Sequence, residues 1–307
     1  MPLMSFKRGQ LEYFVEVARE GQMTRAAKRL HIAQPALSQA IAQLESELGL
    51  KLLERHARGV TLTPAGEAFY EKARLAVAAT DDAIQTARSL ARSQQGTIEF
   101  GFLGAPPGLD SPRQLREFTE AFPDIDIRYR ELPFPTAPTG AWLAEVDVAV
   151  CHQPAPDPAV WSHVLRREPR MALLSRRHPL AGAAELELEE VLGEVFIGMH
   201  PAVEGRWAGF WSLDDHRGGP PERLTTDEAS NPQEVLAALS VRKALTTVPS
   251  SVAAVVANVL SEIDAIPLRC AMPAQISLVG RIDRRTPLVA AMFDFARGLS
   301  EQAAAGV

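Results

Sequence analysis

Residues 23–48 read MTRAAKRLHIAQPALSQAIAQLESEL and decide the fold of the N-terminal part of the chain. A short helix pattern ends at a break over residues 31–33, and Pro35 then opens a second helix in its first turn, where proline is favoured. The second helix has one apolar face and an opposite face of uncharged hydrogen-bonding side chains, formed respectively by Leu37, Ile41, Leu44 and Leu48 and by Gln34, Ser38, Gln39 and Gln43. Two helices joined across so short a turn predict a helix-turn-helix.

The flanking segments extend this unit. Residues 7–20 carry apolar side chains on one side of a predicted helix, which would support the helix-turn-helix. Short apolar segments between residues 50 and 62 surround Ala57-Arg58-Gly59 and predict a two-stranded wing. Arg55 and Arg58 would lie at its tip, where they can contact phosphates or the minor groove of DNA.

A long helix is expected next, because Thr63 can cap it and Pro64 suits its first position. About 30 residues at about 1.5 Å each would make it about 45 Å long. Its apolar and small side chains alternate at spacings of four and three and form a heptad seam of Phe69, Ala73, Ala76, Thr80, Ala83, Ala87 and Leu90. The alternative is packing on its own domain, but so long a stripe favours a second copy of the chain and hence a dimer.

Composition limits the class of protein. The 307 residues are enough for two or more domains, and 46% apolar with 23% charged residues is ordinary for a globular protein. Cys151 and Cys270 form no CxxC pair, so neither a disulfide framework nor a zinc site is expected. The longest apolar run, 252–260, is shorter than the roughly 20 residues of a membrane helix, and the first residues lack a signal core. A cytoplasmic protein without membrane contact is expected.

The net charge of −6 is unevenly distributed. Residues 1–92 contain thirteen Lys and Arg against ten Asp and Glu, a balance of +3, whereas residues 93–307 contain nineteen against twenty-eight, a balance of −9. DNA binding depends on cations placed against phosphates. The basic part holds the helix-turn-helix, so we expect it to contact DNA and the acidic part to be kept away from DNA.

Beyond the polar break at 93–96, alternating strands and helices predict α/β structure with a parallel sheet. The first set comprises strands at 97–103, 126–131 and 147–151 and helices near 112–122 and 139–145. The second set comprises strands near 171–175, 195–199, 222–226 and 245–248 and helices near 186–192 and 231–241. The last elements are helices at 252–260 and 287–299 and a strand at 275–280.

The stretch from Leu11 to Glu67 resembles the DNA-binding signature of the LysR-type bacterial transcriptional regulators almost position by position. Weaker similarity continues in QLREFTEAFPDI, EVDVAV, RRHPLA, LELEEVL and VPSSVA. The resemblance implies an α+β multidomain fold: a winged helix-turn-helix over 1–63, a linker dimerisation helix over 64–93, and an effector-binding domain over 94–307 that resembles periplasmic binding proteins. Its two subdomains would comprise about 97–169 with 268–299, and about 170–267.

By that resemblance, the positions that read bases or contact phosphates are Thr24, Arg25, Gln34, Pro35, Ser38, Gln39, Arg55 and Arg58. Gln34 can pair bidentately with adenine, and Ser38 can bond a base or a phosphate. Two residues depart from the family pattern. Gln39 stands in place of a frequent Arg or Lys, and Ala33 in place of a frequent capping Ser, which costs about 1 kcal/mol. The recognition helix should therefore be less cationic and depend more on its apolar face.

A small molecule is expected to bind between the two subdomains, in loops that leave the carboxyl ends of strands. The residues expected to contact it are Leu103, Gly104, Ala105, Pro133, Phe134, Thr136, Gly198, His200, Thr226, Val248 and Pro249. Helix N-termini facing such a cleft favour an anion, although Asp110 opposes one. The sequence leans slightly towards a small organic or aromatic acid.

The remaining residues do not indicate an enzyme. The seven histidines show no HExxH or HxH spacing, and no GxSxG, P-loop or GxGxxG motif occurs. No catalytic residue, metal or cofactor is expected. Double-stranded DNA, a small-molecule effector, RNA polymerase and further copies in a homodimer or homotetramer are the expected partners.

Two alternatives stay open. One is a metabolite-binding sensor module whose DNA contact is incidental. The other is a thiol redox-responsive regulator using Cys151 and Cys270, although the sequence favours reading both cysteines as buried small side chains.

Overall fold

The computed structural model describes residues 8–56, 59–103, 112–136, 142–152, 157–203 and 205–305. The chain forms two compact units, Met1–Thr86 and Ala87–Val307. Three residues assigned to sites from the sequence, Arg58, Gly104 and Ala105, lie outside the described residues, as does the side chain of Thr136. The domain boundaries drawn from the sequence stay a prediction. Within the described ranges, no helix combines the length and apolar character needed to cross a membrane.

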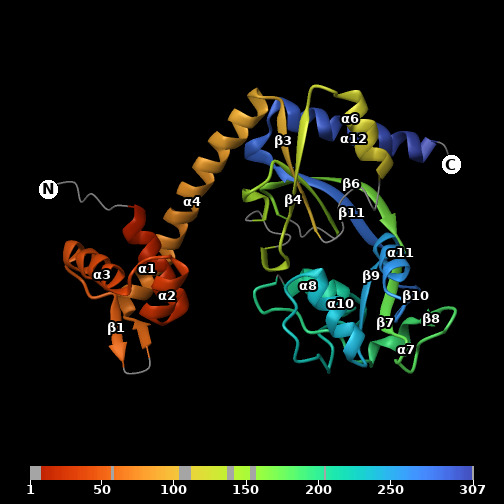
Figure 1. Ribbon diagram of the computed structural model, residues 1–307, viewed down its shortest axis with the longest axis horizontal. Coiled ribbons are helices and arrows are strands. Elements are labelled where there is room, and N and C mark those ends of the chain that lie inside the picture. Colours follow the sequence, from red (N-terminus) through yellow and green to blue (C-terminus); the bar gives the residue numbers. More distant parts are fainter. Residues whose placement is uncertain are drawn as a thin grey trace. The chain divides into compact units, whose positions relative to one another are not determined.

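The first unit is a winged helix-turn-helix, as the sequence predicts (Figure 1). Helices α1 (Arg8–Glu20), α2 (Met23–Arg29) and α3 (Gln34–Leu48) pack with the hairpin of β1 (Leu53–His56) and β2 (Gly59–Leu62) and with the start of α4 (Pro64–Gln94). The seam of α3 is buried, with Leu37, Ile41 and Leu44 at most 1% exposed. Burial of this seam on the α1 side chains fixes the angle of α3 and leaves its polar face outward.

Local backbone features explain where these helices begin and end. His31 adopts φ +55° in the turn between α2 and α3, a conformation rare for residues with a side chain. Ala33 occupies the N-cap of α3 without a side-chain hydrogen bond, in agreement with the expected missing cap. Thr63 caps α4, because its Oγ1 accepts a hydrogen bond from Gly66 N at 2.9 Å.

The predicted heptad seam on α4 divides into two parts. Ala73 is buried in the core of the first unit and Phe69 packs on it, with its ring 5.2 Å from that of Phe14. These two positions therefore belong to the fold of a single chain, which corrects their assignment to a dimer seam. The later seam residues are exposed: Ala76, Thr80, Ala83, Ala87 and Leu90.

Glu45 is a buried carboxylate on α3 that the sequence does not single out. Its Oε1 accepts hydrogen bonds from Leu52 N at 2.8 Å and Leu53 N at 3.1 Å, and its Oε2 pairs with Lys51 Nζ at 2.6 Å. Burial alone would raise the pKa of Glu45, but these hydrogen bonds outweigh it and lower the pKa. The carboxylate thus ties the recognition helix to the first strand of the wing.

The second unit contains two sheets. The five-stranded sheet has the order β4-β3-β5-β11-β6 and the four-stranded sheet the order β8-β10-β7-β9. Their strands are β3 (Thr97–Phe102), β4 (Asp126–Glu131), β5 (Val148–His152), β6 (Val160–Glu168), β7 (Arg170–Ser175), β8 (Leu186–Glu187), β9 (Leu245–Pro249), β10 (Ile263–Arg269) and β11 (Ala274–Arg281). The first predicted set of strands, β3, β4 and β5, pairs in parallel as expected. Antiparallel pairs, which the sequence does not predict, join β11 to β5 and β6 and join β7 to β9 and β10, and β10 pairs in parallel with β8.

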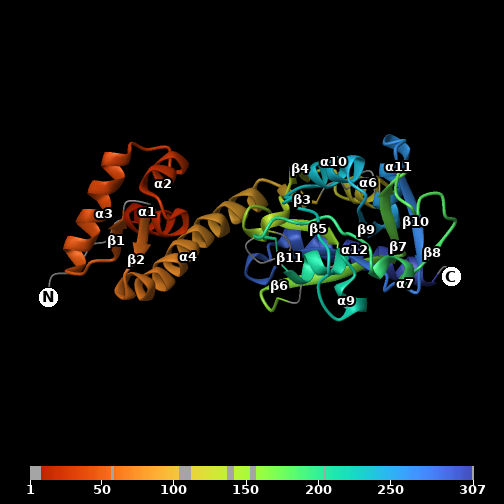
Figure 2. The same ribbon diagram turned by 90° about the horizontal axis from the view of Figure 1, so that it is seen from below.

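Helices cover these sheets. On one face of the five-stranded sheet lie α6 (Pro112–Ala121) and α12 (Pro287–Ala305), where Phe118, Met292 and Phe293 are buried. The remaining elements are η1 (Phe134–Thr136), η2 (Trp142–Ala144), α7 (Leu188–Leu192), α8 (Gly205–Trp211), α9 (Asp214–Arg217), α10 (Pro232–Val241), α11 (Ser250–Val259) and η3 (Ile282–Arg284). Figure 2 shows β7, β8 and β10 side by side, with α11 beside them.

Several predicted elements differ from the observed ones. Segments 195–199 and 222–226 form only isolated bridges, such as Phe196 with Leu224, and are not strands. Strands β6 and β10 and helices α8 and α9 are absent from the prediction. Pro267 in β10 reads as a strand breaker, yet it pairs in register with Met171. Segment 186–192 is a two-residue strand followed by a short helix rather than one helix.

Arg170 holds the region where the chain passes between the two sheets. It is 1% exposed, and its guanidinium lies 3.8 Å above the Phe210 ring centroid. It donates to Asp215 Oδ2 at 2.6 Å, to Met272 O at 3.0 Å and to Phe210 O. The chain crosses from the five-stranded to the four-stranded sheet between β6 and β7, at Arg170, and crosses back between β10 and β11, past Met272. The Arg170 side chain therefore joins both of these crossings to α8 and α9.

Replacement of Glu45 should destabilise the first unit selectively. In the Glu45→Ala variant, two buried backbone N–H groups lose their acceptor, so the free energy of unfolding should fall by about 2 kcal/mol. Thermal unfolding of the full chain, followed by circular dichroism, measures this as an earlier first transition. Glu47→Ala on the same helix, which removes a surface bond from Gln43, is the control. Equal shifts in both variants would contradict the role of Glu45.

Candidate functional site

The exposed face of α3 carries the predicted base-reading residues. Gln34, Pro35 and Gln39 are exposed and Ser38 is half-buried. Gln34 Nε2 donates to Ser38 Oγ at 3.2 Å, so the two side chains lie together one turn apart. This face offers amide and hydroxyl groups that can both donate and accept hydrogen bonds, which is the chemistry required to read base edges.

The arginines around this face differ in whether their guanidinium groups are already paired. Arg25 pairs with Glu20 at 3.4 Å and also donates to the Glu20 carbonyl, so it would have to leave these contacts to reach a phosphate. Thr24 is exposed in the first turn of α2. Arg55 is exposed on β1, in the wing. The wing is attached to the end of α1 by a hydrogen bond from Val60 N to Gly21 O at 2.8 Å.

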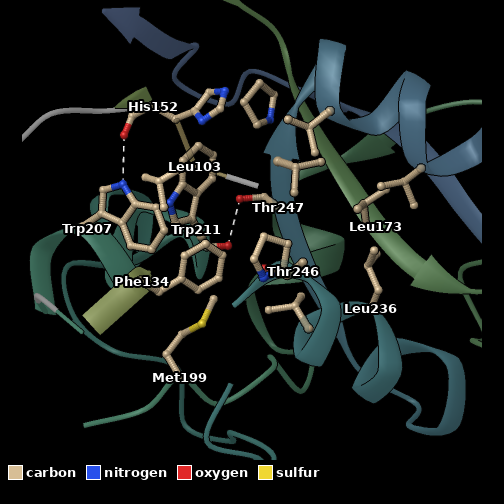
Figure 3. Close-up of a pocket in the computed structure, with 16 residues that line it drawn as sticks. Leu103, Phe134, His152, Leu173, Met199, Trp207, Trp211, Leu236, Thr246 and Thr247 are labelled. Atoms are coloured by element: carbon tan, nitrogen blue, oxygen red, sulfur yellow. Dashed lines mark hydrogen bonds between the residues drawn. The ribbon is translucent and has the colours of Figure 1, made fainter. Parts of the chain in front are cut away.

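A cavity of about 110 Å³ lies in the second unit, between side chains that come from both sheets and from α8, α10 and α11 (Figure 3). Its walls are mostly aromatic and aliphatic, and consist of Leu103, Phe134, His152, Leu173, Met199, Trp207, Trp211, Pro232, Val235, Leu236, Thr246, Thr247, Val248, Pro249, Val252 and Val256. Concave apolar sites with a few polar groups are the usual form of small-molecule sites. The cavity is therefore the candidate effector site.

Two hydrogen bonds hold the aromatic wall (Figure 3). Trp207 Nε1 donates to the His152 carbonyl at 2.8 Å, and Thr247 Oγ1 donates to the Trp211 carbonyl at 2.8 Å. The Phe134 and Trp207 rings lie 5.1 Å apart, and Trp211 meets Trp207 edge to face at 5.9 Å. These contacts join the end of β5 and the middle of β9 to α8.

His152 stands in this wall as a neutral imidazole. Burial lowers its pKa to about 4, against an opposing effect of the Glu168 carboxylate. The side chain is 7% exposed. At neutral pH it therefore contributes hydrogen-bonding nitrogen atoms but no positive charge.

The expected cleft residues are only partly assembled here. Leu103, Phe134, Val248 and Pro249 line the cavity, whereas Pro133, Gly198, His200 and Thr226 are not among the described residues that line it. Gly198 instead packs on backbone, since a Cβ there would lie 2.5 Å from the carbonyl oxygens of Thr225 and Asp227. His200 Nδ1 accepts a hydrogen bond from Ala202 N at 3.1 Å and so stabilises the turn in which His200 lies.

The most prominent wall residues, Trp207 and Trp211, were not predicted from the sequence. They occur four residues apart in GRWAGFW, the spacing that places two side chains on one helix face. That signal could have identified them had α8 been expected. His152 directly ends β5 and could have been found by its place at the carboxyl end of a parallel strand.

The two cysteines have different surroundings. Cys151 is buried, and burial raises the pKa of its thiol, which keeps the thiol protonated and unreactive. Cys270 is exposed, so the expectation that both are buried is wrong for this residue.

The comparisons with known proteins agree with this division of the chain. Residues 9–67 match the family described as bacterial regulatory helix-turn-helix protein, lysR family, and residues 91–300 match the LysR substrate binding domain. The chain belongs to the LysR family. It is thus a transcriptional regulator with a helix-turn-helix and an effector-binding domain, and not an enzyme.

Individual LysR regulators are similar over most of their length. The HTH-type transcriptional regulator AlsR of Bacillus subtilis is 32% identical over 242 residues, which cover 78% of this chain and 80% of AlsR. Full-length CbnR complexed with its target DNA has a TM-score of 0.51 and 25% identity, over 96% of this chain and 100% of CbnR. A full-length BenM mutant has a TM-score of 0.53 and 26% identity, over 97% of each chain.

The neutral state of His152 predicts a pH-dependent stability. Between about pH 6.5 and 4 the unfolded chain protonates this imidazole while the folded protein does not, so stability is complete above this window and is lost as the pH falls. At about pH 5 this effect contributes about 2 kcal/mol. Urea unfolding should show a smaller loss between neutral pH and pH 5 in His152→Gln than in the unmodified protein. An identical loss in both would contradict burial of a neutral His152.

Proposed function

We propose that this LysR regulator binds a specific duplex sequence through α3 and the wing, with Gln34, Ser38 and Gln39 reading base edges and Arg55 and Arg58 contacting phosphates. The observation that best supports this proposal is the hydrogen-bonded Gln34–Ser38 pair on the face of α3 opposite its buried seam. Pro35, Thr24 and Arg25 would position the helix ends against the DNA backbone. Because Gln39 is uncharged, the wing arginines would supply more of the phosphate attraction.

Oligomers would form through the part of α4 that the first unit does not use. Leu75 and Leu90 are 51% and 53% exposed, and Ala76, Thr80, Ala83 and Ala87 provide a stripe of small exposed side chains between them. A second α4 can approach such a stripe closely. A dimer or tetramer would present pairs of recognition helices to two half-sites, where RNA polymerase is a further expected partner.

Control by a small molecule would act through the cavity in the second unit. Its walls come from both sheets, and the chain passes between these sheets near Arg170 and near Met272. A ligand can shift the protein only by binding one arrangement of these walls more tightly than another. Such a shift would alter how the DNA-binding units of an oligomer engage their half-sites.

The second candidate is a sensor module whose DNA contact is incidental. Gel-shift titration of the full chain against the DNA upstream of its own gene separates the two. A specific complex that survives excess random duplex is the result expected of a regulator. Binding no tighter than that of the random duplex would favour the sensor module.

Substitutions on α3 and in the wing should have different effects on DNA binding. Ser38→Ala or Gln39→Ala should change the preferred sequence, with about 1–3 kcal/mol lost on the preferred base pair. Arg55→Ala should weaken binding to all sequences alike and reduce the salt dependence. Fluorescence anisotropy with the upstream duplex and single-base variants measures both. Gln43→Ala, farther along α3, is the control, and uniform losses for every variant would refute the base-reading assignment.

A charge placed in the exposed part of the α4 stripe should disrupt the oligomer. Ala76→Glu would bury a carboxylate against the second helix, and sedimentation velocity should then show monomers. The matched control is Ala78→Glu, which places the same side chain at another exposed position, nearly opposite on the helix. Loss of the oligomer in both variants, or in neither, would move the interface away from this stripe.

A further inference from the structure

We propose that the cavity of this regulator takes a small uncharged molecule, about the size of one substituted ring and carrying a hydrogen-bond acceptor, rather than a carboxylate. The inference rests on the proposed effector control and names the ligand class of that same site. It differs from the organic or aromatic acid towards which the sequence leans.

No cation is among the described residues that line the cavity. None of the sixteen described lining residues is Lys or Arg, and none is Asp or Glu. A carboxylate bound here would lose its hydration without gaining an opposite charge, which strongly disfavours binding.

His152 does not replace the missing cation. Its burial keeps the imidazole neutral near pH 7, and the charge that acts on it most favourably is the carboxylate of Glu168. Arg166, whose charge also acts on this histidine, is paired with the Glu168 carboxylate through its Nε and does not line the cavity.

The helix terminus beside the cavity is already occupied by an internal anion. Pro249 lines the cavity and α11 begins at the next residue, so its first N–H groups would be the natural site for a carboxylate. Ser251 N instead donates to Glu168 Oε2 at 2.8 Å, and Ser250 Oγ donates to the same oxygen at 3.3 Å. Glu168 thus satisfies the positive end of α11 and would repel a second carboxylate.

The polar groups that remain suit a neutral ligand. Trp211 is 5% exposed, and its Nε1 has no hydrogen-bond partner among the described residues, although every buried N–H favours one. Thr247 uses its hydroxyl hydrogen on the Trp211 carbonyl, which leaves oxygen lone pairs available. After a small shift of the indole ring towards the cavity, this N–H could donate to a hydroxyl, ether or carbonyl oxygen of a ligand.

The size and shape of the cavity point to a ring. Its volume of about 110 Å³ is somewhat below the roughly 150 Å³ of an apolar cavity known to hold benzene. Phe134, Trp207 and Trp211 supply aromatic faces and edges on one side, and Leu236, Val252 and Val256 supply aliphatic surface. Aromatic side chains favour the offset and edge-to-face contacts that a flat ring can make.

The decisive experiment compares benzyl alcohol with benzoate on the full-length protein near neutral pH, by isothermal titration calorimetry and tryptophan fluorescence. The two probes share the ring and differ in charge. Benzyl alcohol should bind at least about ten-fold more tightly than benzoate. Equal or tighter binding of benzoate, or no binding of benzyl alcohol up to about 10 mM, would overturn the proposal.

Variants at two positions test the physical cause. Leu236→Lys should reverse the preference towards benzoate, whereas Leu236→Met, of similar length without charge, should keep it. Trp211→Phe should lower the affinity for benzyl alcohol about ten-fold while leaving that for toluene, which has no acceptor, within about two-fold. Equal losses for both probes would remove Trp211 as the donor. Persistence of the neutral preference in a folded Leu236→Lys protein would overturn the electrostatic argument.

Anisotropy of the protein–DNA complex, measured with each probe present, keeps this inference separate from the proposed function. A benzoate preference combined with a ligand-dependent DNA complex would overturn the ligand class and leave effector control intact. Tight binding of benzyl alcohol with an unchanged DNA complex would support the ligand class and count against control through this cavity.

Discussion

The second unit depends on a positive charge that is removed from water. Arg170 is almost fully buried, and an isolated guanidinium at that depth would cost several kcal/mol. Asp215 supplies the opposite charge, the Met272 and Phe210 carbonyls accept hydrogen bonds, and the Phe210 ring covers one face. These partners come from α8, α9 and the segment after β10, so the burial of one charged side chain fixes the two crossings and helix α8, which carries Trp207 and Trp211. The aromatic wall of the cavity is therefore set by an ion pair outside it.

In the first unit a buried negative charge, the Glu45 carboxylate, likewise joins separate elements through its hydrogen bonds. Glu45 lies in the recognition helix, but its partners are the backbone of the wing strand and Lys51. Hydrophobic contact between α3 and the wing would allow small changes in their relative position, whereas two directed hydrogen bonds to consecutive N–H groups allow few. The exposed Gln34–Ser38 face and Arg55 are thereby held in a constant relation. A DNA-reading surface made of two elements needs such a constraint, since base edges and phosphates occur at fixed separations.

The fold of the first unit could be predicted from the sequence because its signals are local. Seam spacing, the Thr63-Pro64 start and the missing cap at Ala33 each depend on residues a turn apart. The second unit could be predicted less well, because its strands pair with distant partners. β10 contains Pro267 and is buried only through β7 and β8, so its own residues carry a weak signal. The candidate cavity was found where strands end, at Leu103, Phe134 and Val248, but the α8 tryptophans reach it through tertiary packing that no local pattern specifies.

The two crossings near Arg170 and Met272 have a mechanical consequence. If the two sheets rotate relative to each other, the backbone at these two connections would have to absorb the change in direction. The Arg170 guanidinium bonds to Met272 O beside one connection and belongs to the other, so it could remain buried during such a rotation. A ring that fills the cavity would then set the angle between the sheets, and the resulting displacement would grow with distance from the connections.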